Sequence, residues 1–446
     1  MSNRTRGISK AFVEALSREK GEPRWMLQKR LEAYRIYEKM SFPPWGPVKS
    51  LKKLDLDSIT HYVRPDTVLS RKWKDVPTEI RETYDALGIP EGEKKYLAGV
   101  GAQYESEMVY HALRKDLQES GIVFEDMGTA VCTYPDIIKE YFGSVIRFGN
   151  NVFSALNGAV WSGGSFVYIP QGVSLEVPLH NFFQMGTPGQ GQFERTLIVA
   201  DQGSDLTFLE GCVAPLYSEL SLHAGVVEII VKKGARVTYT TMQNWSKNVY
   251  NLVTKGSYVE EQGQITWIDG NVGSGVTMKY PSMVLAGPRA CGKLTSVAFA
   301  GKGQEIDSGG TAVHMSPETI SQIESKSIVT GGGRSTFRGN ITVHSDAESS
   351  RSSVSCTSLH LDENATSDAY PKIVSRNASA TIEHEASVTA LSQEQLLFLQ
   401  SRGIREETAR SMIIGGFIEP FTNELPMEYA VEFERLVDLE MSNEME

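Results

Sequence analysis

Cysteine is scarce in this chain, which has only four in 446 residues: Cys132, Cys212, Cys291 and Cys356. They lie far apart, and no two of them form a C-x-x-C pair. Zinc knuckles and thioredoxin motifs both need closely spaced cysteines, so the sequence excludes these two classes. We interpret all four residues as free thiols.

Long hydrophobic runs and an excess of positive charge are missing as well. No window approaches the ~18 consecutive apolar residues of a membrane helix, and residues 1–10 lead into no apolar secretory core. The formal charge is −11, whereas a nucleic-acid platform needs a basic stripe that releases phosphate counterions. We therefore expect a soluble, cytoplasmic protein that binds no nucleic acid and is not membrane-integral.

The charge that is present is unevenly distributed along the chain. Residues 1–50 carry a balance of +6, whereas residues 391–446 carry −8. Two interpretations stay open: both segments are solvated helical faces, or the acidic tail is a docking surface for a basic partner.

Three segments differ in their sequence pattern, and the first, residues 1–150, reads as mostly helical. Apolar residues recur at three- and four-residue spacing from Pro23 to Met40, and a proline-rich cluster at 43–47 ends that helix. A second amphipathic helix is predicted over 106–118, with Gly121 as its C-cap.

The second segment, residues 151–391, is rich in short runs of Val, Ile, Thr and Tyr. Turn signals separate these runs every 8–12 residues, which favours a sandwich, a barrel or a stacked solenoid. Some 240 residues exceed an ordinary sandwich, so we favour a parallel β-helix. The clearest predicted strands are 196–200, 226–231, 236–241, 264–268, 341–344 and 380–385.

Helix returns in the third segment, residues 392–446. Ser392 and Gln395 form a capping box, and Gly403 closes the first helix. A short helix over about 406–414 is predicted to end at Gly415-Gly416, and a last helix begins at Pro426. This tail is too small to hold its own core, so it must pack on the rest of the chain or on another protein.

One motif resembles a phosphate loop but fails on inspection. Residues 287–293 (GPRACGK) have the G-x-x-x-x-G-K spacing, yet Leu294 stands where a Mg²⁺-binding Ser or Thr is required. A strand-like run follows, whereas a phosphate loop leads into a helix. We interpret these residues as a turn between strands.

A second motif, Glu383-His384-Glu385, resembles the start of a zincin helix. Val388 stands where the second histidine would be, so the zincin interpretation fails. On a strand, the two glutamates project from one face and His384 from the other. Metal or acid–base function and plain solvated surface both stay open.

Two thiols deserve separate interpretation. Alternation puts Cys356 on one face of a strand-like run, where a lone cysteine is usually a small buried hydrophobe. Cys212 lies at a turn, where a thiol is easier to reach. Gln243, Trp245 and Lys255 bracket a later loop, and they matter only near a thiol, because an ammonium favours thiolate or persulfide.

With these residues in place, the sequence resembles the SufB/SufD family of the SUF iron–sulfur cluster assembly system, and within it the SufB-type scaffold subunit. The resemblance covers nearly the whole chain. The blocks that carry it are 21–27 (GEPRWML), 191–196 (GQFERT), 210–212 (EGC), 243–245 (QNW), 382–386 (IEHEA), 400–404 (QSRGI) and 424–426 (ELP).

The resemblance implies a fold and partners. It implies an N-terminal helical region, a right-handed parallel β-helix core and a C-terminal helical region that docks the ABC-type ATPase SufC. It also implies residue roles. Cys212 accepts persulfide sulfur, and the path inward is lined by Gln243, Trp245 and Lys255. A transient iron–sulfur cluster then forms at Cys356, with iron received beside it by Glu383, His384 and Glu385.

The chain departs from bacterial members at several positions. Ala365 stands where many have another cysteine, so a four-thiolate site on one chain is not expected. The cluster would then need ligands from a second subunit, either a SufD-type paralogue or another copy of this chain. Gln184 and Gly186 stand where Arg and Asn are common, which puts the bacterial docking of the sulfur donor in doubt.

We therefore expect a non-enzymatic scaffold that collects sulfur and iron, builds a transient cluster and passes it to apo-proteins. Any ATP dependence must come from the partner, because the chain has no credible phosphate loop. The nearest alternative is a SufD-like partner subunit without a cluster site. A β-helix polysaccharide lyase is a rival from another class, and a purely structural solenoid requires both thiols to be inert.

Overall fold

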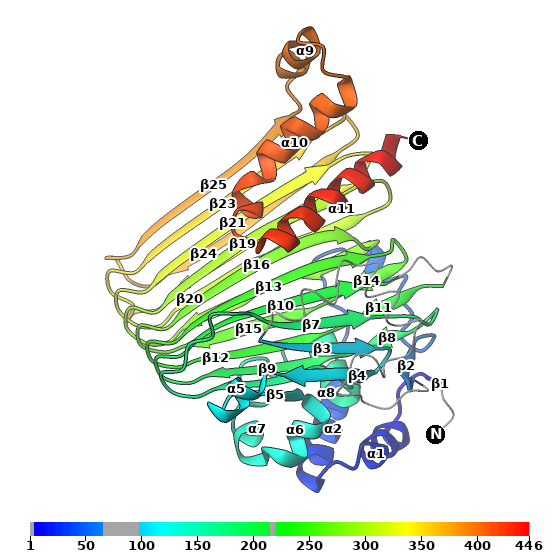
Figure 1. The fold of residues 1–446 in the computed structure, drawn as a ribbon, viewed down its shortest axis with the longest axis vertical. Helices are drawn as coiled ribbons and strands as arrows, with labels where there is room; N and C mark the ends of the chain where they lie inside the picture. Colours follow the sequence, from blue (N-terminus) through cyan, green and yellow to red (C-terminus); the bar gives the residue numbers. More distant parts are fainter. Residues whose placement is uncertain (1–3, 66–97, 215–218, 446) are drawn as a thin grey trace.

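Stacked coils of parallel strands form the centre of the molecule (Figure 1). The structure is a computed structural model, which describes residues 4–65, 98–214 and 219–445. It is mainly β, a parallel β-solenoid of about eight turns with helices at both ends. The predicted fold class is thus confirmed. No helix in these described ranges is long and apolar enough to cross a membrane.

One face of the solenoid is a ten-stranded sheet. Its strands are parallel from β7 onward, and only the hairpin of β3 and β4 is antiparallel. The members are β3 (Gly99–Tyr104), β4 (Glu107–Leu113), β7 (Leu179–Gln184), β10 (Asp205–Val213), β13 (Arg236–Trp245), β16 (Gln264–Gly273), β19 (Cys291–Ala300), β21 (Ile320–Val329), β23 (Arg351–His360) and β25 (Thr381–Ala390).

The opposite face changes its construction along the stack. In the lower coils two short strands follow each other, and in the upper coils one long strand replaces them. One row holds β5 (Val123–Asp126), β6 (Ser165–Ile169), β9 (Arg195–Ala200), β12 (Val226–Val231), β15 (Thr254–Val259) and β18 (Ser282–Leu285). The other holds β8 (Gly191–Gln192), β11 (Ser221–His223), β14 (Val249–Asn251) and β17 (Val276–Lys279). Both rows meet at β20 (Glu305–His314), followed by β22 (Arg334–Val343) and β24 (Thr366–Ser375).

Side-chain stacking between coils explains why these segments form strands. Every second residue of a strand points into the lumen, the space between the two sheets, and in-register pairing places like residues above one another. Phe208, Tyr239 and Trp267 occupy matching positions on successive coils, with ring centroids 5.4 and 5.2 Å apart. All six strands that the sequence predicted are confirmed.

Seven helices in the described N-terminal part cover the lower end (Figure 1). The nonapeptide helix α8 is buried on every side and packs against α2. The bounds of the seven helices are α1 (Lys10–Glu19), α2 (Arg24–Tyr37), α3 (Val48–Leu51), α5 (Lys115–Glu119), α6 (Met127–Thr133), α7 (Pro135–Tyr141) and α8 (Val152–Val160). The same segment also supplies strands β3, β4 and β5, and an antiparallel pair formed by β1 (Arg4–Arg6) and β2 (Thr60–Val63). The domain boundary predicted at residue 150 stays a prediction.

The helix predicted over 106–118 is wrong. Residues 107–113 form β4, which pairs with β3 through a tight turn where Glu105 has a φ of +58°. Both faces of β4 are covered, so Met108, Val109 and Tyr110 are all buried. A short continuous apolar run is compatible with both a buried strand and a helix. The run at Met108–Tyr110 therefore led to the wrong prediction of a helix.

Three C-terminal helices complete the fold: α9 (Gln393–Ser401), α10 (Glu406–Thr422) and α11 (Met427–Met445). Ser392 caps α9 as predicted, since its side chain accepts a hydrogen bond from the Gln395 N–H. The predicted stop at Gly415-Gly416 is wrong, because α10 continues to Thr422. Ile414, Ile418 and Phe421 are buried against the outer face of the ten-stranded sheet, and this packing outweighs the low helix propensity of glycine.

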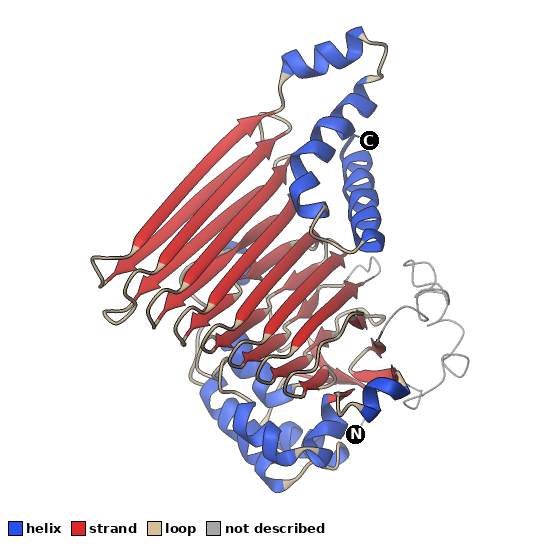
Figure 2. Cartoon of the chain, turned by 60° about the vertical axis from the view of Figure 1, so that its left-hand side comes forward, coloured by secondary structure: helices blue, strands red, loops and turns tan. Residues whose placement is uncertain are grey.

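Figure 2 shows that α10 and α11 lie along that sheet while α9 extends beyond the last strand. The upper end of the solenoid, which we call the open end, consists of β24 and β25. Among the described strands, β24 pairs only with β22, and β25 only with β23. Tyr370, Ile373 and Val388 are 49%, 43% and 59% exposed there.

Candidate functional site

The solenoid brings Cys212 together with the residues assigned to the sulfur path. Cys212 on β10 is in register with Gln243 on β13. Trp245, two residues further along β13, shares a buried apolar cluster with Cys212 and Val249. Lys255 reaches the same part of the lumen from β15 in the opposite sheet, since its Nζ lies 3.8 Å from Glu210 Oε1.

Four charged side chains surround this thiol inside the lumen, and we call them the charged quartet: Glu210, Lys255, Asp269 and Lys279. The Cys212 thiol donates to Glu210 Oε1 at 3.9 Å. Lys255 Nζ lies 3.6 Å from Asp269 Oδ1, and Lys279 Nζ lies 3.4 Å from the same oxygen. All four side chains are at most 2% exposed.

Sequence reasoning assigned no role to Glu210, Asp269 or Lys279. A signal was present for Asp269, because it continues the inward alternation of Ile265 and Trp267 along β16. A carboxylate at an inward strand position needs a buried partner. The partner Lys279 lies on the other sheet, so no local pattern could identify it.

Burial raises the pKa of Cys212 well above its usual value, and the carboxylates of Glu210 and Glu194 raise it further. Lys255 and Lys279 act in the opposite direction. Burial also lowers the pKa of Lys279 to about 8, against the attraction of Asp269. Cys212 is therefore protonated at rest, and the two lysines determine how costly a negative sulfur is at this position.

Hydrogen bonds extend from the charged quartet toward the lower end of the lumen. Gln243 Oε1 accepts from Asn251 Nδ2 at 2.6 Å and from Lys279 Nζ at 3.4 Å. His223 Nδ1 lies 2.8 Å from Asn251 Oδ1, and its Nε2 lies 2.5 Å from Glu194 Oε1. Burial disfavours a charged His223, yet Glu194 holds its pKa above the usual value.

Several donors in this region remain free of hydrogen bonds. In the part of the chain that the structure describes, Gln243 Nε2, Trp245 Nε1 and Lys255 Nζ are buried without a hydrogen-bond partner. Buried donors are normally satisfied by protein or ordered water. The donors face the same part of the lumen as Cys212, so this region suits water or a small polar anion.

Four strands separate Cys212 from the second buried thiol, Cys356. Five strand spacings lead from β10 to β23, which is about 24 Å at ~4.8 Å per spacing. On the first two of the four intervening strands, the inward positions in line with Glu210 and Cys212 are Thr241 and Gln243 on β13 and Asp269 and Asn271 on β16. On the next two strands they are small: Ser296 and Ala298 on β19, and Ser325 and Ser327 on β21.

Cys356 lies on β23 next to the open end. It is 6% exposed, and burial raises its pKa to about 11. Cys356 is in register with Ala386 on β25, and His384 with Val354, so His384 shares the inward face with Cys356. The Nε2 atom of His384 is buried and makes no hydrogen bond to any described residue.

Glu383 and Glu385 project from the other face of β25, where both are exposed. Within the described ranges, no group of three or more His, Cys, Asp and Glu side chains is arranged to hold a metal ion. One chain thus brings Cys356 and His384 together at the open end and leaves the two glutamates outside the lumen.

The three positions that the resemblance singles out, Gln184, Gly186 and Ala365, lie in different surroundings. A Cβ atom on Gly186 would lie 2.2 Å from the Tyr104 hydroxyl, so no side chain fits there unless Tyr104 moves. Gln184 is buried at the end of β7. Ala365 packs against a small apolar cluster that includes Ala298 and Ile306.

Residues 287–290 form a turn, in which Arg289 has a φ of +60°, and residues 291–293 already belong to β19. The described chain around this motif is thus strand, turn and strand, without the helix N-terminus that holds a phosphate. The interpretation as a turn is confirmed.

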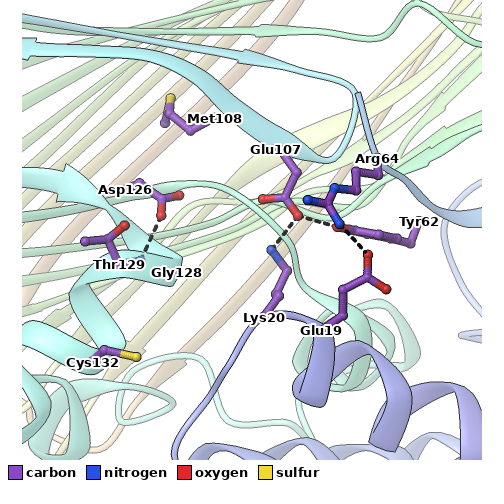
Figure 3. A pocket seen from close by; sticks show the side chains of 10 residues that line it. All are labelled: Glu19, Lys20, Tyr62, Arg64, Glu107, Met108, Asp126, Gly128, Thr129 and Cys132. Atoms are coloured by element: carbon purple, nitrogen blue, oxygen red, sulfur yellow. Dashed lines mark hydrogen bonds and ion pairs between the residues drawn. The ribbon is translucent and has the colours of Figure 1, made fainter. Parts of the chain in front are cut away.

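A concave pocket of about 390 Å³ lies outside the lumen, where the N-terminal helices meet the sheets (Figure 3). Lys20 Nζ and the Tyr62 hydroxyl both donate to Glu107 Oε1, at 2.8 and 2.6 Å. The exposed thiol of Cys132 lines the same pocket. These charges pair with each other, and no residue of the sulfur path lines this pocket.

Two family models match adjacent parts of the chain. The model for the N-terminal region of SufBD proteins matches residues 14–180, and the model for the SufBD core domain of the SUF system for FeS cluster assembly matches residues 182–417. Curated relatives are described as iron–sulfur cluster assembly SufBD family proteins. Those of Staphylococcus epidermidis and Staphylococcus haemolyticus are 52% identical over 436 residues, and that of Staphylococcus aureus is 51% identical. Each alignment covers 98% of this chain and 93% of the relative.

Proposed function

Since this chain belongs to the SufB/SufD family of iron–sulfur cluster assembly proteins, we propose that it is the SufB-type scaffold of such a system. Sulfur arrives at Cys212 as a persulfide and moves through the lumen past Gln243, Trp245 and Lys255. A transient cluster forms at Cys356 and passes to apo-proteins. Iron and the cluster are the cargo, and the chain itself is no enzyme. A cytoplasmic location would keep its thiols reduced.

One observation carries this proposal over the SufD-like alternative. A buried thiol at one end of the lumen lies among cationic and amide side chains, and a second thiol lies at the open end. A partner subunit that only shapes an interface needs neither thiol.

Sulfur transfer to Cys212 needs no outside reductant. The thiol gives its proton to Glu210, and the thiolate attacks the outer sulfur of a donor persulfide, R–S–SH. A new S–S bond forms at Sγ, the donor S–S bond breaks, and the donor leaves as the thiolate R–S⁻. At the end of the path, the Cys356 thiolate binds iron. The His384 imidazole and the carboxylates of Glu383 and Glu385 receive Fe²⁺ first and pass it to this thiolate.

The open end suits a second subunit, either a SufD-type paralogue or another copy of this chain. The free edges of β24 and β25 offer backbone groups for pairing, and Tyr370, Ile373 and Val388 offer apolar contact. Such a subunit would complete the ligand set of Cys356. It would also cover His384, whose Nε2 points away from solvent.

The C-terminal helices suit the SufC-type ATPase. A groove of about 740 Å³ between α9 and α10 is lined by Phe398, Leu399, Met412 and Ile413. Phe398 and Met412 are 58% and 52% exposed, although both are apolar. An apolar groove within an acidic segment fits a partner that carries basic residues around an apolar centre.

We expect Phe398→Asp to weaken capture of the co-expressed ATPase by about tenfold or more, because a charge would be buried in the groove. Val431→Asp is the matched control, since Val431 is 60% exposed on α11 and does not line the groove. Co-purification of the tagged chain measures both variants. Equal loss in both would contradict this docking site.

The proposed function is tested by anaerobic reconstitution of the chain co-expressed with its ATPase partner. Iron, a reductant and a persulfide donor are supplied, and visible absorption and Mössbauer spectra are recorded. We expect the absorption bands and quadrupole doublets of an iron–sulfur cluster. If the complex is folded and never binds a cluster, the SufD-like alternative is correct.

A further inference from the structure

Lys279 has no part in the function described so far, yet its position is unusual. It is the last residue of β17 and only 1% exposed. Its ammonium lies 3.4 Å from Asp269 Oδ1 and 3.4 Å from Gln243 Oε1. A fully buried lysine is costly unless its charge is used or compensated.

Asp269 connects the two lysines of the charged quartet. Its Oδ1 lies 3.6 Å from Lys255 Nζ and 3.4 Å from Lys279 Nζ, which come from two different strands of the opposite sheet. With all four groups ionised, the quartet is neutral. A negative sulfur on Cys212 therefore gives the site a net charge of −1. Without Lys279, the three remaining groups of the quartet would already carry −1, and the negative sulfur would bring the net charge of the site to −2.

Both lysines lie close enough to affect the thiol. Lys255 lies 3.8 Å from Glu210, which accepts the Cys212 proton, and Gln243 links Lys279 to the strand position beside Cys212. Each ammonium has three donor hydrogens, more than its partners here can use. Lys255 Nζ makes no hydrogen bond within the described residues, so the pair has donors to spare for an anion.

We propose that Lys279 is a second cationic residue of the sulfur site, which stabilises anionic sulfur on Cys212 and positions Lys255 through Asp269. The inference rests on the proposed function of Cys212. The anion is the Cys212 thiolate before transfer and the ionised persulfide afterwards. Lys279 acts through its charge and is thus a positioning residue for the attack on R–S–SH.

This role predicts a characteristic pH dependence. Three charged or titratable groups face Lys279 directly: Asp269, Lys255 and Cys212. Glu210 affects Lys279 indirectly, because it contacts Lys255. Because the pKa of Lys279 is lowered to about 8, its charge is present at pH 7 and is lost above pH 8. The advantage of the wild-type chain over a variant without this charge should therefore be largest near pH 7 and should shrink above pH 8.

The test compares wild type, Lys279→Met and Lys279→Arg as full chains under anaerobic conditions. The first readout is the rate of Cys212 alkylation by iodoacetamide between pH 6.5 and 9.5, with a mass spectrum of the Cys212 peptide. The second readout is the rate of persulfide formation on Cys212 from glutathione persulfide. Lys29→Met is the matched control, since Lys29 is half-buried in α2 and donates to the Phe142 carbonyl outside the lumen.

We expect Lys279→Met to slow both reactions by about tenfold at pH 7, which corresponds to about one pH unit in thiol ionisation. Lys279→Arg and Lys29→Met should stay within about threefold of wild type. Unchanged alkylation and transfer in folded Lys279→Met would overturn the inference and leave the proposed function intact. Slowed alkylation without any persulfide on wild-type Cys212 would support the electrostatic role of Lys279 and overturn the proposed function.

A loss of folding in Lys279→Met is addressed by Lys279→Gln, which keeps a hydrogen-bond donor toward Asp269 and removes only the charge. Circular dichroism checks the fold of each variant. A folded Lys279→Gln with the wild-type pH profile would contradict the inference, and one whose deficit disappears above pH 8 would support it.

Discussion

Replacement of Cys356 by alanine should abolish the iron–sulfur cluster that forms on the reconstituted complex. Cys356 is the one thiol of the described chain at the open end, and His384 is the other potential ligand on the same inward face. A nascent cluster without its thiolate loses its strongest ligand. We expect the visible bands to fall by about tenfold or more. Anaerobic reconstitution followed by absorption and Mössbauer spectroscopy measures the loss.

Cys291→Ala is the matched control for this experiment. Cys291 is a half-buried thiol at the start of β19, on the same sheet but outside the lumen path. Its loss should leave the spectra unchanged. Equal spectra in Cys356→Ala and wild type would place the cluster elsewhere. His384→Ala should weaken the bands more than Glu383→Gln when the chain is alone, because only His384 shares the face of Cys356.

Replacement of Glu228 by alanine should cause the largest loss of stability. The Glu228 carboxylate on β12 accepts from Arg195 Nη2 at 2.6 Å and from the N–H groups of Gly143, Val145 and Ile146 at 3.0–3.1 Å. Both side chains of the ion pair are fully buried. These bonds attach the segment after α7 to the solenoid. Alanine would leave the Arg195 charge and three donors unpaired, which costs about 3–5 kcal/mol.

Urea unfolding followed by tryptophan fluorescence and circular dichroism measures this effect as a lower midpoint. The double variant Arg195→Met/Glu228→Leu should be more stable than Glu228→Ala, because it removes both charges together. Glu261→Ala is the control, since Glu261 forms an exposed pair with Lys233 at 2.7 Å and should matter little. A Glu228→Ala midpoint equal to that of Glu261→Ala would contradict the prediction.

Local sequence signals predicted strands throughout the solenoid well, but they missed β4 and the full length of α10. Segments such as β12 and β25 are bounded by turn residues and rich in β-branched side chains, so their local preference agrees with the fold. Strand β4, which lies within the predicted helix over 106–118, reads as helix because both of its faces are covered by other elements. Helix α10 passes through two glycines because its apolar residues are buried on the sheet.

By itself, the sequence predicted the solenoid, the cap of α9 at Ser392 and the failed phosphate loop, and its family resemblance singled out Cys212 and Cys356. The cap and the failed loop depend on residue types and spacings within about ten residues, whereas the solenoid was predicted from the length of the strand-rich segment. The alternation on β25 also determined that His384 and the two glutamates lie on opposite faces.

Only the tertiary structure decided which faces meet. Residues paired on neighbouring coils lie about 30 positions apart in the chain. Register alone places Gln243 beside Cys212, and it places His384 beside Val354, on the same inward face as Cys356. The contact between Asp269 and Lys279 crosses from one sheet to the other. Such contacts depend on the lengths of all the strands and turns in a coil, and a local sequence pattern does not give these lengths.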